Sequence, residues 1–398
     1  MKEEKQKTEN RRWRSVSNIL FALIFVGMLL YPFLRLDTTE VIDSETENRR
    51  MTMWPGFYPD GSYNEWYGHY VEDRVAFREE AVRVYMDSVY ALFGEFAEKL
   101  HMYGKKQEIF PADEGYLAAY QHLATDEALI DDLVTYLDRS NRYLKQKHIP
   151  FVFLAGLDKK TVYPEYMPDD IHVDESRESI MENLSRKLDE KQVPYVIPVE
   201  EFRAAATRDE NRIYNQTCDS AHWNENGLML ALSLLQDEII KQQKEISGDT
   251  TLTPIRPELF KKKTETARLE FLSLPLTEEV PVYDLRKKQK KALVSEDGFI
   301  DTIEHIEGPY VMHLSCENAA TDQTILVFGD SFLQSHMHLF CQQYHDVYGF
   351  GRQNYEHLQL YVETLQPDVV VFENAERAFV DDLYNYTNLA GVTYPGVQ

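Results

Sequence analysis

The hydrophobic positions change their spacing along the chain, and that spacing predicts the elements. Residues 66 to 100 carry apolar side chains three and four positions apart, which indicates an amphipathic helix. Farther along, short apolar runs alternate with helical patterns. The expected strands are 150–154, 195–198, 325–328, 347–350 and 368–372, and the expected helices are 129–147, 176–191, 224–241, 333–344 and 354–365. This alternation predicts an α/β fold with a parallel sheet and helices on both faces.

The alternation stops between the two groups of elements. Residues 242 to 300 contain several prolines and the basic run from Arg286 to Lys291. We interpret residues 246 to 320 as an insertion that covers the fold, between residues 101–245 and 321–398, which form the two parts of one domain. The basic run is either a solvated surface or a contact for lipid headgroups or an anionic polymer.

An apolar stretch near the N-terminus predicts a membrane anchor. Residues 16 to 36 reach the roughly 20 residues that span a bilayer. The basic residues of the tail 1–15 precede it, which places that tail in the cytoplasm. No small-residue cleavage site follows, so we expect a single-pass, uncleaved anchor rather than a removed signal peptide. The linker and helical arm of residues 37–100 and the rest of the chain would then lie outside the cytoplasm. The alternative is a buried helix of a soluble protein.

A serine follows the apolar run that starts at Ile325. The run ends in the turn Gly329-Asp330-Ser331, which would bring the serine to the carboxyl edge of the sheet, where ligands of α/β folds bind. A serine hydroxyl needs a base and an orienting carboxylate before it becomes nucleophilic. Asp219 and His222 lie one helical turn apart in a predicted loop and can supply both. Alternatively, His222 only forms a hydrogen bond in its loop and Ser331 caps a helix.

Other candidates follow the neighbouring strands. Gly351 and Arg352 end one strand, and Asn374 and Arg377 follow the next. With the Ser331 amide, these groups could stabilise an oxyanion and bind substrate. Each also has an ordinary interpretation as a turn residue, a helix cap or a surface ion pair.

Composition narrows the function classes. The net charge of −25 argues against non-specific nucleic-acid binding. We expect no metal and no cofactor, because the chain shows neither metal-ligand spacing nor a glycine-rich phosphate loop. The cysteines are Cys218, Cys316 and Cys341, a number that fits a bacterial surface protein without a disulfide framework. We expect Cys218 to be a packed residue rather than a nucleophile.

The two motifs together resemble a known superfamily. Gly329-Asp330-Ser331 and Asp219-x-x-His222 are similar to SGNH/GDSL hydrolases in permuted order, as in the AlgX/AlgJ alginate O-acetyltransferase family and its DHHW relatives. Further matching segments are Glu47-Asn48-Arg49, Asp73 to Arg78, Lys160 to Pro168, His222-Trp223-Asn224 and Glu376-Arg377. Many relatives place the aspartate two positions before the histidine, where this chain has Ser220.

The resemblance implies a circularly permuted three-layer sandwich with a central parallel sheet. It implies an O-acetyltransferase with Ser331 as nucleophile, His222 as base and Asp219 as orienting acid, with Lys160 and Trp223 near the substrate. The acceptor would be a polysaccharide, and a membrane-bound O-acyltransferase would supply the acetyl group. The alternatives are an esterase with the same three residues, or a non-catalytic polysaccharide-binding or assembly protein.

Overall fold

The computed structural model describes residues 16–30 except 17 and 28, 43–44, 49–50, 52, 68–70, 72–73, 78–97, 100–123, 127–206, 211–268, 276–287, 311–379 and 386–397. The chain forms two compact units, residues 1–98 with 269–276 and residues 99–268 with 277–398. Several predicted features lie outside the described residues, namely the tail 1–15, the end of the anchor at 31–36, Glu47 and Asn48, 74–77 and the basic positions 288–291.

The first unit contains part of the predicted amphipathic helix. Helix α3 spans Arg78–Phe93, and the strands β1 (Asp43–Ser44) and β2 (Arg49–Arg50) pair antiparallel. Helix α3 ends at Gly94, whose positive φ of 69° is the conformation that glycine commonly supplies after a helix. Among the described residues, no helix is both long and apolar enough to cross a membrane.

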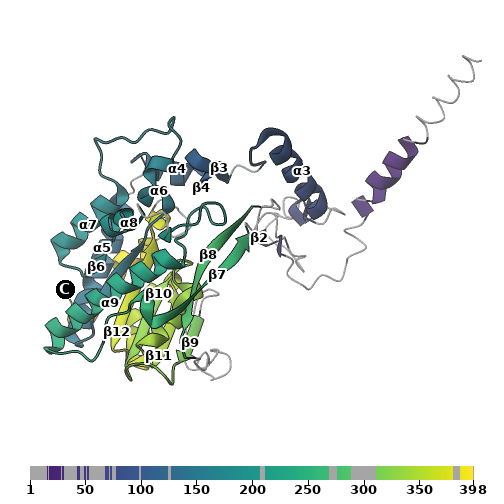
Figure 1. The fold of residues 1–398 in the computed structure, drawn as a ribbon. Coiled ribbons are helices and arrows are strands. Elements are labelled where there is room, and N and C mark those ends of the chain that lie inside the picture. The colour runs from purple at the N-terminus through teal and green to yellow at the C-terminus, as the bar shows by residue number, and fades with distance from the viewer. Residues whose placement is uncertain are drawn as a thin grey trace, which may run out of the picture. The chain divides into compact units, whose positions relative to one another are not determined.

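The second unit is built on a six-stranded sheet (Figure 1). Its strands, in the order in which they pair, are β6 (Tyr195–Val196), β5 (Phe151–Gly156), β12 (Val369–Ala375), β10 (Thr324–Gly329), β11 (Asp346–Gly351) and β9 (Val311–Ser315). All neighbours are parallel except β9, which runs antiparallel to β11. The expectation of a wholly parallel sheet is therefore wrong at one edge. Strand β9 was not predicted, because only Leu314 of its five residues is fully buried and the apolar pattern is weak.

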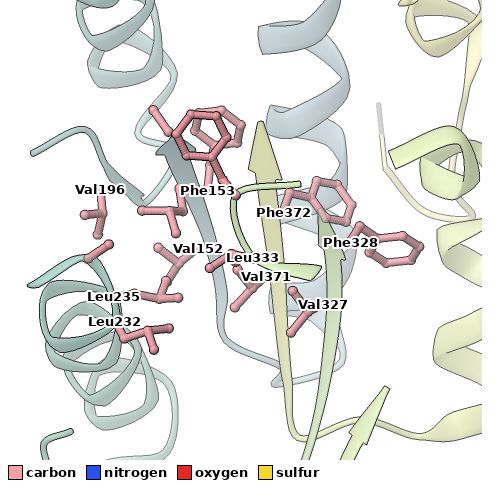
Figure 2. Packing of buried hydrophobic residues seen from close by; sticks show 14 of the residues in the cluster. Val152, Phe153, Val196, Leu232, Leu235, Val327, Phe328, Leu333, Val371 and Phe372 are labelled. Atoms are coloured by element: carbon pink, nitrogen blue, oxygen red, sulfur yellow. The ribbon is translucent and has the colours of Figure 1, made fainter. Parts of the chain in front are cut away.

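The two faces of the sheet carry different side chains. Figure 2 shows Leu232 and Leu235, which lie in the helix before the insertion, packing beside Val152 on the aliphatic face. On the other face, Phe372 stacks on Tyr136 with their ring centroids 5.8 Å apart. Helices therefore cover both faces, and the core is a three-layer sandwich.

The helices agree with the hydrophobic pattern in most places. The α-helices of this unit are α4 (Glu114–Tyr120), α5 (Glu127–Gln146), α6 (Lys159–Val162), α7 (Ile180–Lys191), α8 (Val199–Ala206), α9 (Glu225–Ser247) and α10 (Leu358–Leu365). The side chains of Ser179 and Glu182 form a capping box at the start of α7, and Asn224 caps α9. The segment from Lys160 to Pro168 that resembles the family begins in α6, which forms one helical turn.

Several short helices are of the 3₁₀ type. They are η1 (Lys105–Gln107), η2 (Pro164–Tyr166), η4 (Pro257–Leu259), η6 (Gln334–Gln342), η7 (Arg352–His357), η8 (Glu376–Phe379) and η10 (Tyr386–Gly391). The predicted α-helix at 333–344 is thus a 3₁₀ helix, and the one at 354–365 begins as 3₁₀. Apolar positions three residues apart fit both helix types, so the pattern could not separate them.

The described residues of this unit also form two antiparallel hairpins. Strands β3 (His101–Tyr103) and β4 (Ile109–Pro111) form one, and β7 (Phe260–Arg268) and β8 (Thr277–Leu285) form the other. The second lies in the predicted insertion, for which the sequence analysis names no strand. Pro281 is tolerated because, among the described residues, β8 pairs with β7 alone and is an edge strand, where proline is commonly found.

Cys316 and Cys341 are joined by a disulfide, which the sequence did not lead us to expect. The bond connects the residue after β9 to η6, the segment that follows Ser331. Both cysteines are buried, whereas Cys218 is a free, half-buried thiol.

We expect loss of this disulfide to lower stability substantially. The two cysteines are 25 residues apart, and a cross-link over such a loop contributes about 3 kcal/mol by restricting the unfolded chain. Urea unfolding without reductant should show this loss when the Cys316→Ala/Cys341→Ala variant is compared with wild type, whereas Cys218→Ser should leave stability close to wild type. Equal unfolding free energies for wild type and the double variant would contradict the prediction.

Candidate active site

The carboxyl ends of the parallel strands bring the predicted residues together. Ser331 follows β10, and Asp219 and His222 lie in the loop before α9. His222 Nε2 lies 2.9 Å from Ser331 Oγ, and His222 Nδ1 lies 3.0 Å from Asp219 Oδ2. The three side chains therefore form one hydrogen-bonded line, although His222 and Ser331 are 109 residues apart in the sequence. This arrangement lets the imidazole accept the serine proton while the carboxylate holds the ring.

Asp219 is fixed by its own loop. Its Oδ1 accepts hydrogen bonds from the backbone N–H groups of Ala221 and His222, each at 2.9 Å. Burial raises the pKa of the Asp219 carboxyl, but the charge and hydrogen bond of His222 and these N–H groups outweigh it. The pKa of Asp219 therefore lies below its ordinary value of 3.8, and the group is an anion at neutral pH. The spacing of three residues thus directs the carboxylate at the imidazole.

The turn before Ser331 is held by Asp330. Its Oδ1 accepts from the Phe332 N–H at 3.1 Å, and its Oδ2 accepts from the Ala375 N–H at 2.9 Å. Arg352 Nη1 lies 3.3 Å from the same Oδ2. Asp330 thereby ties the ends of β10, β11 and β12 together beneath the serine.

A second carboxyl, which sequence reasoning missed, lies under this turn. Glu373 is fully buried in β12, and its Oε2 accepts from the Asp330 N–H at 2.9 Å. A Cβ atom at Gly329 would lie 2.9 Å from Glu373 Oε2, and one at Gly156 would lie 2.8 Å from Oε1. Glycine at both positions therefore makes room for the carboxyl group.

The surroundings of Glu373 favour its protonated, neutral form. Burial raises its pKa, and the negative charge of Asp330 raises it further, well above the ordinary 4.5. A carboxylate in the middle of an apolar strand is a signal that the sequence does offer, because charged groups are rarely buried without a partner.

We expect Glu373→Gln to weaken the pH dependence of stability. The unfolded chain loses this proton above pH 4.5 while the folded protein keeps it, so the free energy of unfolding falls with rising pH. The slope is about 1.4 kcal/mol per pH unit until the raised pKa is reached. Glutamine cannot ionise, so its variant lacks this term. Denaturant unfolding at mildly acidic and mildly alkaline pH measures the difference, with the exposed Glu363→Gln as control. The same loss in wild type and Glu373→Gln would show that Glu373 is ionised.

A small cavity opens beside Ser331. Its volume is about 210 Å³, below the roughly 300–1,000 Å³ of pockets for drug-sized ligands. The lining residues are His222, Gly329, Asp330, Ser331, Gln334, Arg352, Gln353, Ala375 and Arg377. Ser331 is exposed at its mouth. A cavity of this size suits a small acyl group.

Arg377 places a positive charge at the cavity, and its side chain is held by contacts with Asp158 and Phe332. Its Nε donates to Asp158 Oδ1 at 3.0 Å, and the guanidinium lies 5.2 Å from the centre of the Phe332 ring. Burial raises the pKa of Asp158, but Arg377 and Lys160 lower it below its ordinary value. Together with Arg352, Arg377 supplies a field that stabilises a negative oxygen.

Five of the sequence candidates lie outside the cavity lining, namely Asp219, which contacts His222 from behind, and four others. Trp223 is buried, and its Nε1 donates to the Phe332 carbonyl at 3.1 Å. Lys160 is buried, forms ion pairs with Asp158 at 2.8 Å and Glu376 at 3.0 Å, and lines a separate cavity of about 690 Å³. Asn374 Oδ1 accepts from a tyrosine hydroxyl at 2.7 Å, and the Gly351 carbonyl accepts from a side-chain amide at 3.1 Å.

No family model and no curated protein matches the chain. Solved structures do match. The chain has the fold of PatB1. The structure of PatB1 from Bacillus cereus superposes on this chain with a TM-score of 0.54. The match covers 73% of this chain and 100% of the PatB1 chain, at 13% sequence identity. A second PatB1 structure, with a sulfonyl adduct, is 14% identical over 72% of this chain and 98% of its own, at a TM-score of 0.50.

Two further matches have lower TM-scores. The O-acetyltransferase domain of AlgJ from Pseudomonas putida is 14% identical over 73% of this chain and 98% of its own, at 0.45. AlgX from Pseudomonas aeruginosa is 13% identical over 79% of this chain and 72% of its own, also at 0.45. AlgJ and AlgX are the two proteins after which the family that the sequence resembles is named.

Proposed function

We propose that this chain is an O-acetyltransferase that modifies the hydroxyl groups of a cell-surface or secreted polysaccharide. The observation that carries the proposal is the hydrogen-bonded line of Ser331, His222 and Asp219 beside a small cavity with two arginines. The family resemblance of the motifs supports acetyl transfer to a sugar, and the PatB1-like fold is consistent with it.

The proposed reaction has two halves. First, His222 Nε2 takes the proton of Ser331 Oγ as Oγ bonds to the acetyl carbon, and His222 then protonates the departing group. Second, His222 takes the proton of an acceptor hydroxyl as that oxygen bonds to the acetyl carbon, and the bond to Oγ breaks with return of the proton to Ser331. Asp219 holds the imidazole throughout. The Ser331 N–H, Arg352 and Arg377 stabilise the oxyanion of each half-reaction.

Hydrolysis is a second candidate, because Ser331 is exposed. Water can reach the acyl-enzyme as readily as a sugar hydroxyl can, and the chemistry with water is that of an esterase. The two functions therefore differ only in which oxygen attacks.

We also propose that the catalytic domain lies outside the cytoplasm, anchored by residues 16–36. The Cys316–Cys341 disulfide supports this location, because such bonds persist mainly in oxidising compartments. A membrane-bound O-acyltransferase would then pass the acetyl group outward to Ser331.

The test is an acetyl-ester assay on the full chain in detergent, with and without a soluble polysaccharide. Transfer predicts that the acceptor speeds release of the alcohol and gains acetyl groups. Release of acetate alone, unaffected by any acceptor, would favour the esterase. No acetylation of the enzyme by any acetyl ester would contradict both and leave a binding protein.

A further inference from the structure

The loop that precedes the catalytic histidine is held by a strand of the insertion. Glu278 lies in β8, and its carboxylate accepts the backbone N–H groups of Gln216 and Thr217, each at 2.8 Å, and of Cys218 at 3.3 Å. Three successive N–H groups thus point at one anion, an arrangement known as an anion-binding nest. The next residue in the chain is Asp219.

The same hairpin contacts the chain again beyond His222. The Tyr283 N–H donates to Glu225 Oε2, and the Tyr283 hydroxyl lies 3.1 Å from Asn226 Oδ1. Glu225 and Asn226 form the first turn of α9, beside which β8 runs (Figure 1). Strand β8 therefore fixes the chain on both sides of the segment that carries Asp219 and His222.

We propose that Glu278 is a positioning residue for the Asp219–His222 pair, which makes the inserted hairpin part of the catalytic apparatus. The inference rests on the proposed function. Backbone N–H groups that lack a partner are costly, and hydrogen bonds to a carboxylate are roughly twice as strong as neutral ones. Glu278 therefore sets the direction in which the backbone enters position 219, and so the direction of the carboxylate that holds the imidazole.

The opposite side of the loop has other supports. Lys159 Nζ and the Ile109 N–H both donate to the Gln216 carbonyl, each at 3.0 Å. These contacts fix the carbonyl of residue 216 and leave the N–H groups of residues 216–218 to Glu278. Removing the charge of Glu278 should therefore tilt the loop without detaching it.

The first test compares Glu278→Gln with Glu279→Gln in the full chain. Glutamine keeps the size of the side chain but turns an amide NH₂ toward backbone donors. Glu279 is the matched control, since it lies next in β8 and pairs with the exposed Thr266 hydroxyl at 2.5 Å. We expect Glu278→Gln to lower kcat for an acetyl ester about 10- to 100-fold, with KM within about twofold and a modestly lower melting temperature, because the N–H groups of residues 216–218 lose their carboxylate partner. Glu279→Gln should match wild type.

A double-mutant cycle distinguishes a role of Glu278 in positioning Asp219 from a general loosening of the loop. If Glu278 acts through Asp219, then Glu278→Gln in the Asp219→Asn background should cost little more than Asp219→Asn alone. Effects that multiply, or an unchanged kcat for Glu278→Gln, would overturn the inference. If Glu278→Gln fails to fold, the test uses Glu278→Asp, which keeps the charge on a shorter side chain. This variant should still lower kcat while leaving KM nearly unchanged.

A spectroscopic measurement tests the positioning role of Glu278 independently of the proposed function. The His222 Nδ1–H proton, hydrogen-bonded to Asp219, should resonate downfield in wild type and in Glu279→Gln, and should shift in Glu278→Gln. A wild type that accepts no acetyl group would refute the proposed function, and this resonance alone would then decide the inference. An unshifted resonance in Glu278→Gln would refute the positioning role.

Discussion

Ser331→Ala should lower kcat for acetyl-ester turnover by about 10⁴-fold or more, as loss of the nucleophile does in other serine enzymes. Ser331 Oγ lies 2.9 Å from His222 Nε2 at the exposed mouth of the cavity. Its removal leaves no buried group unpaired, so the free energy of unfolding should stay within about 0.5 kcal/mol of wild type. Steady-state kinetics and thermal unfolding of the same preparation measure both.

The matched control is Ser335→Ala, an exposed serine four positions farther along, which should keep full activity. Turnover that survives Ser331→Ala would remove the acyl-enzyme mechanism, whether acetyl goes to a sugar or to water. Equal losses in the two variants would point to damage of the segment after β10 instead.

Asp219→Asn should lower kcat by about 10³- to 10⁴-fold and change KM little. The asparagine oxygen can still accept the N–H groups of Ala221 and His222, which the aspartate accepts at 2.9 Å. Its NH₂ group would then face His222 Nδ1 and favour the ring tautomer that cannot accept the serine proton. Kinetics in single-turnover conditions should place the loss in the acylation step.

The variant also tests the spacing of the motif. Ser220 is buried, and the carboxylate that contacts His222 Nδ1 comes from Asp219, so we expect an aspartate at position 220 not to replace it. Asp219→Asn/Ser220→Asp should therefore be no more active than Asp219→Asn. Rescue by the second change would mean that the carboxylate acts from the position two before the histidine, as in many relatives.

Asp219 also makes stability depend on pH. Because its folded-state pKa lies below the ordinary 3.8, its contribution is present above that value and is lost as the pH falls through the lowered pKa. The wild type should therefore lose stability in acid more steeply than Asp219→Asn does.

The sequence predicted the nucleophile turn because its signals are local. Four apolar residues mark a buried strand, and Gly329-Asp330-Ser331 marks the bend after it. Asp219 and His222 are one helical turn apart, so their shared direction could also be inferred. Their meeting with Ser331 follows from the rule that parallel strands present their carboxyl ends at one edge.

Other parts depend on long-range contacts that a linear pattern does not contain. Nothing near Glu278 indicates that it binds the backbone 60 to 62 residues earlier. The pairing of Cys316 with Cys341 likewise depends on how β9 joins the sheet edge. Lys160 shows a related limit, because a motif gives the residue type but not whether the side chain points toward the cavity or into an internal ion-pair network.

Ser331 carries the acetyl group in the proposed mechanism, and its covalent state during turnover can be measured directly. The full chain is mixed with an acetyl ester, quenched in acid, digested and analysed by mass spectrometry. We expect one acetyl group on Ser331, absent from Ser331→Ala, formed far more slowly in His222→Ala, and lost faster when a polysaccharide acceptor is added. Turnover with Ser331 unmodified, or an acetyl group on another residue, would contradict this mechanism.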